Sequence, residues 1–213
     1  MSLEPGMSLF VAPENGRRYF HVEYAQVSYP IFPGHANAFK TAAEMLIDQY
    51  LGQTFNNDSL VFPVLTLYRH SVEIVLKDLV RLGLAMDIYD DADLKAILGK
   101  DYKAGELSRD AVLTKHKLPP LWCYTLKLIT SVEAGDERVA VAAELIDQFH
   151  AVDEDGQTLR YDRDARTLRW TRERFKDMPQ VIDVANLRHV ANALFDYLED
   201  WHSYITDLRS SAD

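Results

Sequence analysis

The sequence has few of the features that mark secreted, membrane-spanning or zinc-bound proteins. It has one cysteine, Cys123, among 213 residues, which excludes an internal disulfide framework and a cysteine-based zinc cluster. No apolar run approaches the roughly 20 residues needed to span a bilayer. The N-terminus lacks a basic segment followed by a long apolar stretch, so we expect no signal peptide. These features predict a cytoplasmic protein without a membrane partner.

Short motifs of the common enzyme classes are also missing. The sequence contains no GxGxxG, no P-loop, no HExxH and no GxSxG pattern. The acidic run at 153–156 has its glycine at the fourth position, whereas a calcium loop has it at the sixth. We therefore expect no cofactor and no bound metal ion.

The composition is that of one globular domain. Apolar residues make up 47% of the chain and charged residues 26%, close to the average for folded proteins. The net charge of −10 argues against non-specific binding of nucleic acid over the whole surface, although a local basic patch remains compatible with it.

Helical periodicity covers most of the chain. Helices are expected at 37–54, 60–85, 91–98, 119–132, 137–150 and 184–208. The second is apolar almost all round, so we expect it to be central and buried. The last carries a 3-4 heptad seam that is typical of helix bundles.

Two segments depart from this pattern. Alternation of Phe20, Val22 and Tyr24 with polar residues indicates a strand within an extended arm, 1–34. Residues 157–170 have the pattern of a β-hairpin. The predicted fold is mainly α: an up-and-down helical bundle over 35–213, with a small β-hairpin and an extended N-terminal arm.

A cluster of ionisable residues marks the central helix. Arg69, Glu73 and Lys77 are spaced i, i+4, i+8 and share one face, and His70 lies three residues before Glu73. Ionised groups on a buried helix must be paired or face a cavity. Two interpretations are about equally supported: a polar site that lines a groove, or a buried network that fixes the register of the helix.

His116 precedes the next predicted helix and could join this cluster. An ordinary capping or loop histidine is the simpler interpretation of its spacing. Arg160 or Tyr161 could approach the same cluster from the hairpin.

The hairpin region is basic. Residues 160–176 hold seven basic and three acidic side chains, a net +4. Aromatic residues alternate with the arginines, as in some proteins that bind single-stranded nucleic acid. Candidate binding residues are Arg160, Tyr161, Arg166 and Arg169. The alternative, which we favour on frequency alone, is a solvated hairpin that pairs with acidic surface.

Three short motifs, in order, resemble a known family. Residues 68–77, YRHSVEIVLK, resemble a "YRHxxExxLK" helix; the pattern HxLxxLW follows at 116–122; and LRYxxD at 159–164 is similar to an "FRYPxD" segment. This order resembles uncharacterised bacterial HEPN-like helical-bundle proteins over about residues 60–205. The resemblance implies an α-helical bundle that commonly dimerises. Some members are RNA-cleaving toxins or defence proteins and others are binding modules without activity.

The resemblance also implies candidate catalytic residues. Active members carry an Arg-x4–6-His motif, and Arg109 and His116 have this spacing here. With the central cluster, the candidate catalytic residues are His70, Glu73, His116 and Arg109, and the candidate binding residues include Arg69 and Lys77. The expected function is an RNA-associated or defence-type module, with or without catalysis; an active form would be a metal-independent ribonuclease. The alternative is a module that binds a protein partner and no nucleic acid.

A homodimer is expected from the last helix. Trp201 lies on its seam, and Val190, Tyr197 and Tyr204 flank it. The apolar stripe is wider than one neighbouring helix needs, so part of it is predicted to face a second subunit.

Overall fold

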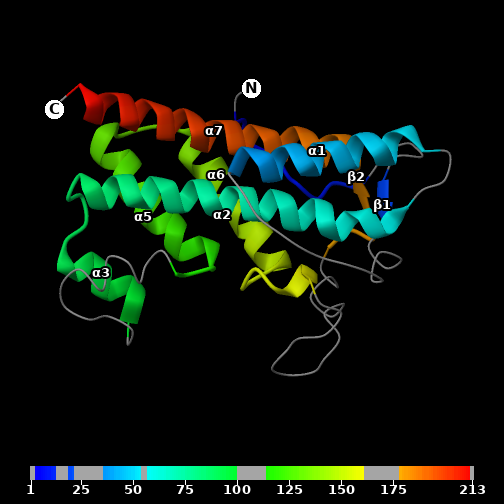
Figure 1. Ribbon diagram of the computed structural model, residues 1–213, viewed down its shortest axis with the longest axis horizontal. Helices are drawn as coiled ribbons and strands as arrows, with labels where there is room; N and C mark the ends of the chain where they lie inside the picture. Colours follow the sequence, from blue (N-terminus) through cyan, green and yellow to red (C-terminus); the bar gives the residue numbers. More distant parts are fainter. Residues whose placement is uncertain are drawn as a thin grey trace.

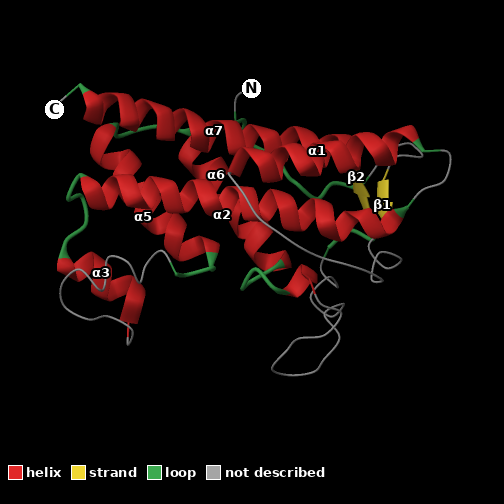
Figure 2. Ribbon diagram, in the orientation of Figure 1, coloured by secondary structure: helices red, strands yellow, loops and turns green. Residues whose placement is uncertain are grey.

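The fold is that of a computed structural model, which describes residues 3–12, 19–21, 36–53, 57–99, 114–160 and 178–211. The described chain is mainly helical (Figure 2). Its α-helices are α1 (Ala36–Gly52), α2 (Val61–Ala85), α3 (Asp91–Leu98), α5 (Leu118–Val132), α6 (Arg138–Val152) and α7 (Val184–Ser210). Short 3-10 turns lie at Asp58–Leu60 and Thr158–Arg160. The predicted mainly-α bundle is thus confirmed.

Helix α2 is the centre of the bundle. It packs against α1, α5 and α7, and α6 packs against α5. Figure 1 shows α1, α2 and α7 running along the long axis of the molecule, whereas α5 crosses α2. Because α2 has neighbours on several sides, it buries polar as well as apolar positions, Arg69 and Glu73 among them.

The central helix α2 has the length and apolar composition of a membrane span. It is the one helix among the described residues that is long and apolar enough to cross a bilayer. Of its most apolar window, 56% is buried inside the fold. Such burial is typical of the core helix of a soluble protein.

Helices α3, α5 and α7 begin where the local sequence favours a helix start. In α3, Asp90 Oδ1 accepts a hydrogen bond from Asp93 N at 2.8 Å, and Asp93 Oδ2 accepts one from Asp90 N at 2.9 Å, which is a capping box. In α7, Asp183 Oδ1 accepts from Asn186 N at 2.9 Å. Prolines occupy the first turn of α5, where their missing N–H groups have no intrahelical partner to lose.

The β structure differs from the predicted hairpin. Strand β1 (Tyr19–His21) pairs antiparallel with β2 (Val181–Asp183), so the sheet joins segments that are distant in sequence. The prediction of strand at 158–160 is wrong, because these residues form a 3-10 turn. Thr158 N donates to Asp153 Oδ1 at 2.9 Å, which curls the chain back instead of extending it. Residues 161–170 lie outside the described ranges, as do Val22 and Tyr24.

The apolar stripe of α7 is largely covered within one chain. Val190, Tyr197 and Trp201 are all at most 3% exposed. Tyr197 Oη and Trp201 Nε1 both donate to Asp136 Oδ2, at 3.1 and 3.2 Å. Of the residues used to predict a second subunit, only Tyr204 remains open, at 48%.

Candidate functional site

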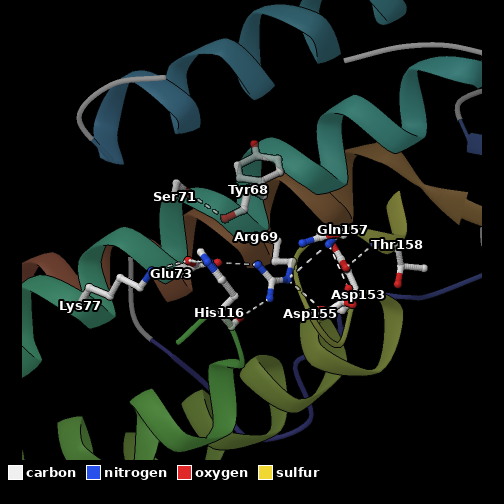
Figure 3. A network of polar contacts seen from close by, with 10 residues as sticks. All are labelled: Tyr68, Arg69, Ser71, Glu73, Lys77, His116, Asp153, Asp155, Gln157 and Thr158. Carbon is white, nitrogen blue, oxygen red and sulfur yellow. Dashed lines mark hydrogen bonds and ion pairs between the residues drawn. The ribbon is translucent and has the colours of Figure 1, made fainter. Parts of the chain in front are cut away.

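Arg69 lies at the centre of a polar network that joins three parts of the chain (Figure 3). Its side chain is 2% exposed. Nη1 donates to Glu73 Oε2 at 2.8 Å, Nη2 to the His116 carbonyl at 2.6 Å, and Nε to the Asp153 carbonyl at 2.9 Å. The guanidinium therefore ties α2 to the start of α5 and to the end of α6.

Glu73 is the acceptor at the other end of this network. It is 2% exposed, and its Oε1 accepts from Lys77 Nζ at 2.7 Å and lies 2.9 Å from His116 Nδ1. Burial alone would raise the pKa of Glu73, but the hydrogen bond from Lys77 and the charge of Arg69 lower it to about 2. The carboxylate is therefore ionised at neutral pH.

His116 is the most open member of the network, with a side chain that is 58% exposed. An ionised carboxylate only accepts hydrogen bonds, so the contact with Glu73 places the proton of a neutral imidazole on Nδ1. The other ring nitrogen, Nε2, then has a lone pair that can take up a proton. A buried carboxylate that orients an accessible imidazole is an arrangement suited to acid–base chemistry.

The loop that follows α6 closes the network from the other side. Asp153 is 1% exposed, and its Oδ2 lies 3.7 Å from Arg69 Nε. Gly156 has φ +75°, and a Cβ there would lie 2.9 Å from Arg69 Nη1. A glycine is therefore required at this point both for the turn and for the close approach of the guanidinium. Lys117 and Glu154 form an ion pair between the start of α5 and this loop.

The structure brings together four of the residues that the sequence singled out. Arg69, Glu73 and Lys77 follow the predicted i, i+4, i+8 row, and His116 joins them from the neighbouring helix start. The ring of His70 packs edge-on against Phe39 of α1, with centroids 4.4 Å apart. This ring contact of His70 joins α1 to α2.

The remaining candidates are not placed by the described residues. Arg109, Tyr161, Arg166 and Arg169 lie outside the described ranges, and so does the side chain of Arg160.

Asp153 and Gly156 belong to the network, although the sequence alone did not predict them as site residues. A signal for their true role was an aspartate directly after a helix, followed three residues later by a glycine in a turn.

Within 3–12, 19–21, 36–53, 57–99, 114–160 and 178–211, no three or more His, Cys, Asp or Glu side chains are grouped so as to hold an ion. No protein-family model, no curated protein and no solved structure matches the chain.

Proposed function

We propose that this chain is a cytoplasmic, HEPN-like module that acts on RNA, with His116 as the group that meets the RNA. The observation that carries the proposal is the exposed imidazole of His116 held by the buried, ionised carboxylate of Glu73. Lys77, at 13% exposure, and the exposed Lys117 add positive charge close to this imidazole.

This geometry suits cleavage by the 2′-hydroxyl of RNA better than cleavage by a nucleophilic side chain of the protein. The 2′-hydroxyl of RNA is itself a nucleophile, so cleavage needs a protein group that removes its proton rather than a reactive side chain. The imidazole of His116, with its lone pair on Nε2, is such a group. The ammonium groups of Lys77 and Lys117 attract the phosphodiester. The active form of this module is a metal-independent ribonuclease.

The test is cleavage of single-stranded RNA, in the presence of a chelator, by the parent chain and by His116→Ala. We expect a loss of about 10²-fold or more, because general acid–base catalysis contributes roughly that much. His202→Ala, on the partly exposed surface of α7, is the matched control and should cleave at the parent's rate. RNA binding without cleavage would indicate the non-catalytic form, and neither binding nor cleavage would overturn the proposal.

A second candidate function is a protein-interaction module. Tyr204 and Leu208 expose 48% and 40% of their surface near the C-terminal end of α7, which extends beyond α1 in Figure 1. Exposed apolar side chains in one place favour contact with another protein, and a second copy of this chain is the partner that the resemblance suggests.

The dimer is tested by light scattering at micromolar concentration. We expect a mass twice the 24.4 kDa of one chain, and we expect Tyr204→Lys combined with Leu208→Lys to halve it. A parent chain that already has the mass of a monomer would contradict the dimer.

A further inference from the structure

His150 lies beside the same network, close enough to feel the charges of Arg69, Lys117 and Glu154. It belongs to the last turn of α6. Three and four residues later, Asp153 receives a hydrogen bond from Arg69 and Glu154 pairs with Lys117. Because Lys117 directly follows His116, these contacts bring the end of α6 to the segment that carries the exposed imidazole.

The surroundings of His150 differ from those of His116. Its Nδ1 is buried and has no hydrogen-bond partner among the described residues, while the ring as a whole is only partly buried. Burial, together with the positive charges of Lys117 and Arg69, lowers the pKa of His150 against the opposing charges of Glu154 and Asp147. The surroundings of the two histidines thus differ: His116 Nδ1 contacts the Glu73 carboxylate, whereas His150 lies among charges of both signs and has a buried Nδ1.

Two imidazoles beside one network suit a reaction that needs two proton transfers, because one can act as the base while the other acts as the acid. Cleavage of RNA by its own 2′-hydroxyl is a reaction of this type.

Resting on the proposed function, we propose that His150 is the second proton-transfer residue of the site and that the substrate is an RNA phosphodiester. One imidazole removes the proton of the 2′-hydroxyl, and the 2′-oxygen forms a bond to phosphorus. The bond from phosphorus to the 5′-oxygen breaks, and the other imidazole, in its protonated form, gives that oxygen a proton. The products are a 2′,3′-cyclic phosphate and a 5′-hydroxyl, and the two imidazoles have exchanged protonation states.

The first test is cleavage of single-stranded RNA by His150→Gln and His150→Ala, with His202→Ala as control. We expect both variants to lose at least 10²-fold in rate and to remove one limb of the pH–rate profile, because one of the two titrating groups has gone. Thermal unfolding reports whether each variant is folded. Since glutamine keeps the size and polarity of the side chain, a folded His150→Gln decides the question if His150→Ala is unstable.

The second test does not depend on activity. Inorganic phosphate is added to the parent chain while the histidine ring signals are followed by NMR. We expect the signals of His116 and His150 to move together along one binding curve, and those of His202 to stay in place.

The outcomes separate this inference from the proposed function. If His116→Ala abolishes cleavage while folded His150→Gln cleaves within about threefold of the parent, His150 has no proton-transfer role and the function stands. If phosphate moves His116 alone, the inference is overturned in the same way. RNA binding without cleavage also overturns it, whereas a parent chain that neither binds nor cleaves RNA overturns both.

Discussion

Arg69 is buried and yet keeps hydrogen bonds in three directions. Its acceptors are one carboxylate and two backbone carbonyls, and each belongs to a different part of the chain. Only a guanidinium offers donors in a rigid plane that can reach all of them at once; an ammonium carries the same charge on a single atom. The residue is therefore specified by the geometry of its acceptors as well as by their charge.

Replacing Arg69 by lysine should cost stability although the charge is kept. An ammonium reaches part of this set, and each carbonyl left without a donor in the interior costs about 1–3 kcal/mol. We expect Arg69→Lys to lower the free energy of unfolding, measured in urea, by about 2–4 kcal/mol. The control is Arg81→Lys, because Arg81 is 54% exposed and pairs with Asp78; it should change stability by less than about 1 kcal/mol. Equal losses in both variants would contradict the role given to Arg69.

Glu73 has a structural and a potential chemical role at once. It neutralises the buried Arg69 on one oxygen and orients the exposed His116 from the other. A change at Glu73 therefore affects fold and site together, so it cannot distinguish a functional site from a structural network. A change at His116 can make this distinction, because most of its side chain is exposed and its removal leaves the pair of Arg69 and Glu73 in place.

The lowered pKa of Glu73 makes a prediction about acid stability. The folded value is about 2 against an ordinary value of 4.5, so between these pH values the unfolded chain binds the proton and the folded chain does not. The contribution is complete above pH 4.5 and is lost as the pH falls to about 2; it amounts to about 3 kcal/mol. We expect urea unfolding to show this loss in the parent and not in Glu73→Gln. Glu133→Gln, at an exposed position, should keep the parent's pH dependence.

At the scale of the elements, the sequence predicted what local periodicity controls. The helices appear within about two residues of their expected bounds, because most of the segments are long and carry a clear 3.6-residue pattern. The row of Arg69, Glu73 and Lys77 follows from the same periodicity. The approach of Asp153 and His150 to Arg69 could not be predicted. It depends on how the end of α6 meets α2, and no spacing along the chain contains that information.

The junction between α2 and α3 depends on a glycine. A Cβ added to Gly83 would overlap the phenol ring of Tyr89, whose hydroxyl donates to the Tyr124 carbonyl of α5 at 3.0 Å. Alanine normally stabilises a helix relative to glycine by up to about 1 kcal/mol, but here the clash reverses the sign. We expect Gly83→Ala to lower the free energy of unfolding by about 1–3 kcal/mol. Gly52→Ala in α1, with nothing within 4 Å of the added Cβ, should be neutral or slightly stabilising.

At the scale of the whole molecule, charge is unevenly distributed along the chain. The total is −10, while residues 160–176 carry a net +4. An RNA strand is repelled by most of such a protein and attracted to one segment. If the chain binds RNA, this segment is therefore expected to supply most of the phosphate contacts, and the site around His116 would act on the RNA held there.

Neutralising three arginines of this segment tests the idea. We expect the combined change of Arg160, Arg166 and Arg169 to glutamine to weaken the binding of single-stranded RNA. Each phosphate that the protein no longer neutralises reduces the steepness of the plot of log affinity against log salt concentration by about 0.7. Loss of three contacts should therefore make the slope shallower by about 2. The measurement is a series of binding titrations between low and physiological salt.

The matched control removes the same charge elsewhere. Arg81, Lys95 and Arg209 are exposed cations on α2, α3 and α7, and their combined change to glutamine alters the net charge by the same three units. Long-range attraction depends on the total charge, whereas the release of counterions depends on local binding of phosphate. A localised site therefore predicts that the control keeps the parent's salt slope. If both triple variants show the same reduced slope, or if neither does, the basic segment is a solvated surface that does not bind RNA specifically.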